Sequence, residues 1–346
     1  MSQDTSETLR KPQTDDRPLQ DIMCGIYGYP AVLVAHELKL FALLADKPLS
    51  LDEICAAKNL ARRPAHALLA VATALGLLRL HDGRYALTPL AEDYLLEDSP
   101  TYFGVNFDGA LGTYAVWSPA SLKQAVLTDA PQGPFASTAD PFKASAWQAE
   151  QARGFTRWMH SVSMAPALAW PGVVDLAPYQ VMLDVGGGSG AHCIGALRRW
   201  SHLRAVVLDA PAVCDVAQEF AVQYGLQERL STTRGDFWTD PLPPADVHFY
   251  SQIFHDWPPE KGRFLARKSF GALAPGGRII VHEVLFNDDR TGPFAVAGLN
   301  VVMLIAMKGQ EYSGRELSTM LTEAGFTDIE VKPTFGYWSI VTGRKP

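Results

Sequence analysis

The feature that most constrains the fold is a cluster of glycines that follows an apolar run. The run Val181–Val185 leads into Gly186-Gly187-Gly188-Ser189-Gly190, and a helical pattern extends from Ala191 to about Trp200. Glycines let the backbone approach a ligand closely, and a helix start offers free N–H groups. Since α/β folds hold nucleotide-like ligands in this way at the carboxyl edge of a sheet, we expect such a domain here.

The C-terminal half alternates strand-like runs with helical patterns, which predicts βαβ units and a parallel sheet. The strand candidates are Val181–Val185, Ala205–Leu208, Leu230–Thr233, Val247–Ile253, Arg278–Val284, Asp328–Lys332 and Tyr337–Thr342. Only about four residues separate the last two runs, too few for a parallel crossover, so we expect the last strand to be antiparallel. A parallel sheet with a C-terminal antiparallel strand is typical of class I methyltransferases rather than of dinucleotide dehydrogenases.

We divide the chain into a disordered tail (1–18) and three further segments. Residues 19–100 suggest a winged helix, with a Ser50 cap before one helix, a hairpin at Asp82-Gly83, and Thr88 capping another helix. Residues 101–172 are rich in aromatics and mostly helical, and residues 173–346 form the Rossmann-like catalytic domain. The aromatics of the middle segment include Phe103, Phe107, Tyr114, Trp117, Phe135, Phe142 and Trp147.

The composition of the 346 residues excludes several functional classes. The net charge of −7 disfavours nucleic acid as a partner, because phosphate binding needs a basic face. No apolar run is long enough to cross a bilayer, and the polar N-terminus does not resemble a signal peptide. The four cysteines are scattered, so we expect neither a metal site nor disulfides. Because free thiols persist in a reducing compartment, we expect a cytoplasmic location.

Acidic and aromatic residues follow successive predicted strands at the same edge as the glycines. Asp184 lies on the first strand, Asp209 ends the second, and Asp236-Phe237 follows the third. These side chains suit an amino group, ribose hydroxyls and an adenine. Gly186-x-Gly188-x-x-Ala191 also fits a relaxed dinucleotide fingerprint, so the glycines alone do not separate NAD from S-adenosylmethionine.

One histidine stands out by its position. His255 follows the fourth strand, and Glu283 and Glu311 are placed where either could reach it. A neutral imidazole there would remove a proton from a hydroxyl that attacks a methyl sulfonium, and a carboxylate would orient the ring. We expect Asp256 to cap the helix that starts near Pro258.

The combined motifs resemble those of the plant-type small-molecule O-methyltransferases, which include caffeate, flavonoid and acetylserotonin enzymes and bacterial relatives. The resemblance covers about residues 25–343. It rests on 184–190, Leu208-Asp209-Ala210-Pro211, Gly235-Asp236-Phe237, Phe254-His255-Asp256-Trp257, His282-Glu283 and Gly309-Gln310-Glu311.

The resemblance implies S-adenosyl-L-methionine as cofactor, a phenolic or enolic small-molecule acceptor, and a homodimer formed through the N-terminal domain. It implies that His255 is the general base, flanked by Glu283 and Glu311, and that Gly186, Asp209, Asp236 and Phe237 hold the cofactor. Phe155 and Met159 would line the acceptor pocket, while Ser163 would approach the cofactor. We add Asp184, Gly188 and Ser251 to the cofactor site, and Phe254, Asn300 and Met303 to the pocket.

Several positions depart from the family pattern. Ser251 and Gln252 stand where relatives often carry Lys or Arg, Tyr312 where Arg is common, and Asn300 where plant members often place an acid. The alternatives to O-methylation are a diverged member that methylates carbon, and one that uses the cofactor without methyl transfer. A winged-helix transcription factor is a further alternative, which the acidic charge disfavours.

Overall fold

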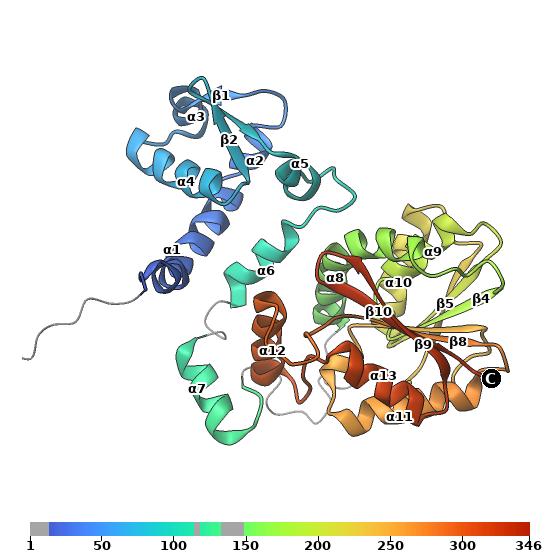
Figure 1. The fold of residues 1–346 in the computed structure, drawn as a ribbon. Coiled ribbons are helices and arrows are strands. Elements are labelled where there is room, and N and C mark those ends of the chain that lie inside the picture. The colour runs from blue at the N-terminus through green and yellow to red at the C-terminus, as the bar shows by residue number, and fades with distance from the viewer. Residues whose placement is uncertain (1–13, 114–117, 133–148) are drawn as a thin grey trace, which may run out of the picture. The chain divides into compact units, whose positions relative to one another are not determined.

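The computed structural model describes residues 14–113, 118–132 and 149–346, and it divides the chain into two compact units with a boundary between Leu111 and Gly112. Each unit has its own hydrophobic core. Figure 1 shows the two units and their elements. The expectations for Tyr114, Trp117, Phe135, Phe142 and Trp147 lie outside the described residues.

The N-terminal unit combines helices with a small antiparallel sheet. Its helices are α1 (Arg17–Glu37), α2 (Leu40–Leu43), α3 (Leu51–Lys58), α4 (Arg62–Ala74), α5 (Pro89–Leu95) and most of α6 (Val105–Thr113), which runs across the boundary. The strands β1 (Leu49–Ser50), β2 (Leu78–His81) and β3 (Arg84–Leu87) pair in the order β1-β3-β2. The predicted hairpin and the Ser50 and Thr88 caps are confirmed. Helix α1 starts at Arg17, within the segment expected to be a tail, since Pro18 suits a first helical turn.

The C-terminal unit is built on a seven-stranded sheet of order β6-β5-β4-β7-β8-β10-β9. Its strands are β4 (Val181–Val185), β5 (Arg204–Asp209), β6 (Leu230–Arg234), β7 (Val247–Ser251), β8 (Arg278–Val284), β9 (Thr327–Phe335) and β10 (Trp338–Arg344). Neighbours from β6 to β8 are parallel, whereas β10 is antiparallel to both β8 and β9. The predicted parallel sheet with an antiparallel C-terminal strand is therefore confirmed.

Helices cover both faces of this sheet (Figure 1). One core contains side chains of α8 (Ala149–Ala169), η3 (Trp170–Gly172), α9 (Ala191–Arg199) and α10 (Pro211–Gln223). The other contains side chains of η4 (Phe254–Asp256), α11 (Pro259–Ala272) and α13 (Gly314–Glu323). Helix α7 (Pro119–Thr128) contacts α12 (Phe294–Ala306), which lies between β8 and α13 in the chain.

Strand β7 ends two residues earlier than the sequence suggests. The apolar pattern predicts a strand to Ile253, but Gln252 adopts a left-handed backbone with φ of 54°. This turn redirects the chain into η4, which carries His255. The end of β7 therefore positions the catalytic candidate at the carboxyl edge of the parallel strands.

Candidate active site

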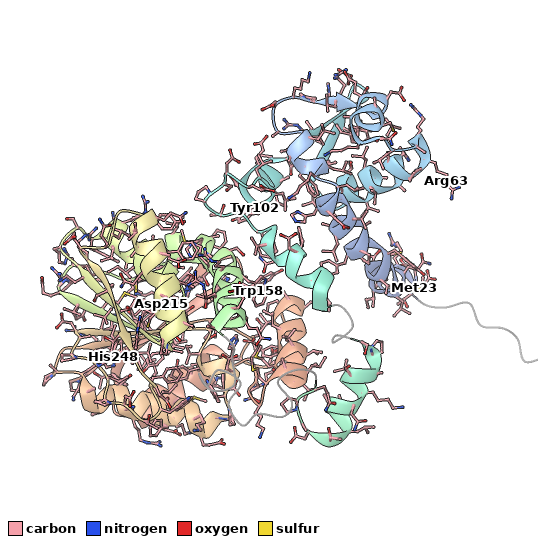
Figure 2. All side chains as sticks on the ribbon, turned by 180° about the vertical axis from the view of Figure 1, so that it is seen from behind. Met23, Arg63, Tyr102, Trp158, Asp215 and His248 are labelled. Carbon is pink, nitrogen blue, oxygen red and sulfur yellow. The ribbon has the colours of Figure 1, made fainter. Side chains whose placement is uncertain are left out.

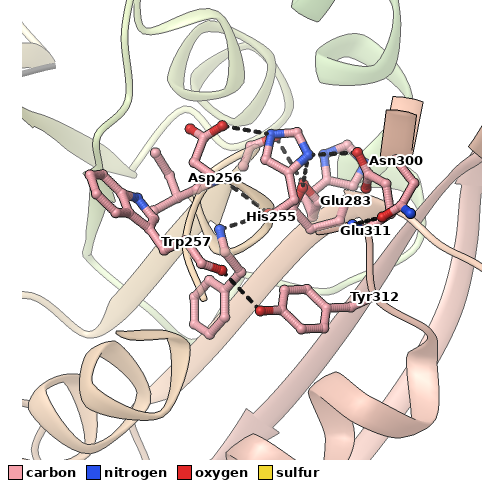
Figure 3. A network of polar contacts seen from close by, with 11 residues as sticks. His255, Asp256, Trp257, Glu283, Asn300, Glu311 and Tyr312 are labelled. Atoms are coloured by element: carbon pink, nitrogen blue, oxygen red, sulfur yellow. Dashed lines mark hydrogen bonds and ion pairs between the residues drawn. The ribbon is translucent and has the colours of Figure 1, made fainter. Parts of the chain in front are cut away.

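His255, Glu283 and Glu311 come together although they lie on three different parts of the chain. Nδ1 of His255 donates a hydrogen bond to Oε1 of Glu311 at 3.0 Å, because a carboxylate can only accept. The same Nδ1 lies 3.6 Å from Oε2 of Glu283. The side chains of both glutamates are almost completely buried, at 2% and 0% exposure. The ring orientation of His255 is therefore fixed from the Nδ1 side (Figure 3).

Asp256 lies on the opposite side of the ring, as Figure 3 shows. Its Oδ1 is 3.5 Å from Nε2 of His255. The expectation that Asp256 is the N-cap of the next helix is wrong, because Pro258 holds that position in α11. The two ring nitrogens therefore face different carboxylates, since Nδ1 lies beside the two glutamates and Nε2 beside Asp256.

The neighbouring carboxylates control the pKa of His255. Burial alone would lower this pKa, but the charges of Glu283, Asp256 and Glu311 outweigh burial and raise it well above its ordinary value of 6.5. Burial also raises the pKa of Glu283, and the positive ring of His255 opposes that shift. The site thus stabilises the imidazolium, the protonated form of His255.

Glu283 and two further residues, Tyr312 and Asn300, hold the backbone of the site. Oε1 of Glu283 accepts hydrogen bonds from the backbone N–H groups of Ile253 and Phe254, both at 3.1 Å. The hydroxyl of Tyr312 donates to the carbonyl of Trp257 at 3.0 Å. Oδ1 of Asn300 accepts from the backbone N–H of Glu311 at 2.9 Å. Glu283 therefore holds the turn that carries the ring through two hydrogen bonds, and Glu311 is hydrogen-bonded to the ring itself.

The glycine loop between β4 and α9 has the backbone shape of a ligand cradle. Gly186, Gly188 and Gly190 adopt positive φ angles of 67°, 56° and 74°. A Cβ at Gly188 would meet nothing within 4 Å, so the loop is open there. Oδ2 of Asp209 accepts from the N–H of Gly188 at 2.9 Å, and its Oδ1 accepts from the N–H of Ala210 at 2.7 Å. Asp209 thus braces the loop and keeps further acceptor capacity for ribose hydroxyls.

Asp184 lies directly beneath the loop. A Cβ at Gly187 would be 2.6 Å from its Cγ. Its Oδ2 accepts from the thiol of Cys193 at 3.4 Å, while its buried Oδ1 has no hydrogen-bond partner among the described residues. Burial raises the pKa of Asp184 to about 7. An unpartnered buried carboxyl oxygen beside an open glycine loop fits a ligand that brings a donor or a positive charge, as S-adenosylmethionine does.

The remaining predicted cofactor residues have different surroundings. Oδ1 of Asp236 accepts from the N–H of Trp238 at 2.8 Å, and Phe237 is partly buried beside Trp238, with ring centres 5.0 Å apart. The hydroxyl of Ser251 donates to the carbonyl of His282 at 3.0 Å, so only its acceptor capacity is left for a ligand. Ser163 lies partly exposed on α8.

The predicted pocket residues do not all share one environment. Phe155 and Met159 are partly exposed on α8, while Asn300 and the buried Met303 lie on α12. Phe254 is completely buried, with its ring edge-on to Tyr250 at 5.3 Å. Because this ring packs within the core, we leave Phe254 out of the proposed pocket.

The sequence analysis did not predict the contact between Asp256 and His255. The only signal for it in the sequence is that the two residues are adjacent.

Comparisons with known proteins identify the family of the chain. Residues 119–327 match the O-methyltransferase domain, and residues 20–97 match the O-methyltransferase dimerisation domain. The 3-hydroxy-5-methyl-1-naphthoate 3-O-methyltransferase of Streptomyces sahachiroi is 33% identical over 312 residues, which are 90% of this chain and 89% of that protein. The tetracenomycin polyketide synthesis 8-O-methyl transferase of Streptomyces glaucescens is 33% identical over 347 residues, 97% of this chain and 99% of that protein.

A solved structure supports the same assignment. Human N-acetylserotonin methyltransferase in complex with S-adenosylmethionine superposes with a TM-score of 0.81 at 27% identity, covering 97% of this chain and 99% of that one. No helix in the described part of the chain is long and apolar enough to span a membrane. The chain belongs to the O-methyltransferase family and is an S-adenosylmethionine-dependent O-methyltransferase with an N-terminal dimerisation domain.

Proposed function

We propose that this enzyme methylates a hydroxyl of an aromatic or enolic small molecule, with His255 as the general base. The observation that carries the proposal is the ring of His255, bonded to Glu311 through Nδ1 and flanked there by Glu283. Nε2 takes the hydroxyl proton of the acceptor, and the two glutamates stabilise the resulting imidazolium. The relatives named for naphthoate, tetracenomycin polyketide and N-acetylserotonin substrates support an aromatic acceptor.

The cofactor is held by the glycine loop and by the acidic residues at the same sheet edge. We assign Gly186, Gly188, Asp184, Asp209, Asp236 and Phe237 to this site, with Ser163 and Ser251 at its margin. S-adenosylmethionine supplies an electrophilic methyl group when it is bound. Phe155, Met159, Asn300 and Met303 are the proposed acceptor contacts, and the apolar surfaces of Phe155, Met159 and Met303 suit a flat ring.

The N-terminal unit is proposed to form a homodimer. Helix α1 exposes apolar side chains that a monomer would leave in water: Leu19, Ile22, Met23, Ile26 and Tyr27. Met23 projects from α1 in Figure 2. Burying such a surface against a second copy is favourable, and the match of residues 20–97 to a dimerisation domain supports this role.

The activity is tested by transfer of a labelled methyl group from S-adenosylmethionine to a panel of hydroxynaphthoates and N-acetylserotonin. His255→Gln should lower kcat by about 10²- to 10⁴-fold, the usual contribution of a general base. Its affinity for S-adenosylhomocysteine should match that of the wild type. The control is His66→Gln, an exposed position on α4. Equal loss of turnover and cofactor affinity in His255→Gln would show that His255 is not the base.

A further inference from the structure

His160 lies at a junction of three elements and has no part in the chemistry described above. It belongs to α8, and its Nδ1 is 2.8 Å from the hydroxyl of Ser189 in the glycine loop. Its Nε2 is 3.4 Å from the hydroxyl of Tyr224, next to α10. The ring stacks on Phe220 of α10, with centres 3.6 Å apart and planes 8° apart. The histidine is 7% exposed.

The glycine loop needs such outside support. Three of its residues are glycines with positive φ, and a glycine-rich backbone is costly to order because it has many accessible conformations. Asp209 holds Gly188 from β5, and His160 holds the next residue, Ser189, from α8. Two adjacent loop residues are thus fixed by two different elements.

The position of His160 is itself well fixed. Arg153 and Arg157 of α8 both pair with Glu219 of α10. At the other end of α8 the helices approach so closely that a Cβ on Gly195 of α9 would lie 1.9 Å from the carbonyl oxygen of Ala167. Helix α8 therefore packs against α10 near its N-terminus and against α9 near its C-terminus. These contacts keep the imidazole of His160 beside the glycine loop.

The protonation state of His160 suits this role. Burial, and to a smaller extent Arg157, lowers its pKa to about 4, so the ring is neutral near pH 7. A neutral imidazole carries one N–H, so it donates one of its two hydrogen bonds and accepts the other. Both Ser189 and Tyr224 carry hydroxyls that can serve either way.

We propose that His160 is a positioning residue for the cofactor, which holds the glycine loop in its binding conformation through the hydrogen bond to Ser189. This inference rests on the proposed placement of S-adenosylmethionine at the glycine loop. Loss of the contact leaves His255 and its carboxylates in place but makes the ordering of the loop part of the cost of cofactor binding. Loss of this contact therefore weakens cofactor binding and leaves the KM of the acceptor unchanged.

Two substitutions at His160 separate hydrogen bonding from packing. His160→Phe keeps a ring on Phe220 and removes both nitrogens, while His160→Asn removes the ring and keeps an amide where Nδ1 was. Ser189→Ala removes the hydroxyl from the loop side, and the double variant His160→Phe/Ser189→Ala completes a cycle. Ser189→Ala deletes a single oxygen, so it carries the test even if His160→Phe does not fold.

Binding of S-adenosylhomocysteine is measured by calorimetry for each variant, together with its unfolding temperature without ligand. We expect His160→Phe and Ser189→Ala each to weaken binding by about 3- to 10-fold, the usual range for one hydrogen bond, and the double variant to be no weaker than either. His160→Asn should stay within about 2-fold of the wild type. His66→Phe, at an exposed position, is the control.

The outcomes distinguish this inference from the proposed function. Wild-type affinity in both His160→Phe and Ser189→Ala, or losses that multiply in the double variant, would overturn the role of His160 alone. A wild-type protein that does not bind S-adenosylhomocysteine would instead overturn the cofactor site. A rise in the acceptor KM with unchanged cofactor affinity would also contradict the inference.

Discussion

Gly309 offers a sharp test of how the site is held together. It lies in the loop after α12, two residues before Glu311, and packs against the backbone of the turn that carries His255. A Cβ at this position would lie 1.9 Å from the carbonyl oxygen of His255 and 2.4 Å from the carbonyl carbon of Asp256. Both neighbours are backbone atoms, so they cannot move aside as a flexible side chain would.

The size of the displacement follows from these distances. Real Cβ atoms essentially never approach other atoms to less than 3.0 Å, so Gly309→Ala requires a shift of about 1.1 Å between the loop and the turn. A misplacement of about 1 Å at a reacting group can cost about 10²-fold in rate. We therefore expect kcat/KM to fall about 100-fold.

The assay compares methyl transfer with cofactor binding. Affinity for S-adenosylhomocysteine should stay within about 2-fold of the wild type, because the glycine loop is formed by other residues. Gly271→Ala in α11 is the matched control, since its Cβ would meet nothing within 4 Å, and it should keep full activity. If Gly309→Ala turned over within about 3-fold of the wild type, the tight packing of this loop on the catalytic turn would be refuted.

Three other substitutions test the packing, the electrostatics and the assembly. Gly195→Ala should destabilise the protein by about 1–3 kcal/mol in thermal unfolding, because the new methyl group forces α9 away from the carbonyl of Ala167; an unchanged melting temperature would refute this contact. His192 is buried with neither ring nitrogen bonded in the described structure, and burial lowers its pKa to about 3. As the pH falls below 6.5, the unfolded chain binds a proton at His192 that the folded protein does not bind. In urea unfolding, the free energy of unfolding of the wild type should therefore fall by about 1 kcal/mol relative to that of His192→Phe between pH 7 and 5.5. A constant difference between the two proteins would contradict the burial of a neutral ring. Ile22→Glu should yield a monomer by light scattering without loss of helical content; a dimer that persists would place the interface away from the exposed face of α1.

The regular parts of the catalytic unit could be predicted because periodic patterns specify them. The runs Val181–Val185 and Arg278–Val284 match β4 and β8 residue for residue. The ends of parallel strands meet at one edge, which is why Glu283 and His255 could be paired from the sequence alone. Ser50 could be assigned as a cap because its reciprocal bonds with Glu53 depend only on local spacing.

The irregular turns of the site could not be predicted in the same way. Whether Phe254 faces the core or the pocket depends on the left-handed turn at Gln252, and no periodicity signals that turn. Asp256 resembles a helix cap in sequence, yet its side chain lies beside Nε2 of His255. The contact of His160 with Ser189 joins residues 29 positions apart on two elements, so it depends on how α8 docks. Tertiary packing decides each of these placements.

The pH dependence of kcat/KM tests the central claim, that His255 removes the acceptor proton with Glu311 supporting its charged form. Wild type and Glu311→Gln are compared with one acceptor between pH 6 and 10, so ionisation of the acceptor affects both equally. Three carboxylates raise the pKa of His255, so the rising limb of the wild type should lie above the ordinary value of 6.5. Removing the charge of Glu311 should move this limb to lower pH by about one unit. A limb with the same midpoint in both proteins would contradict the role of His255 as the base paired with Glu311.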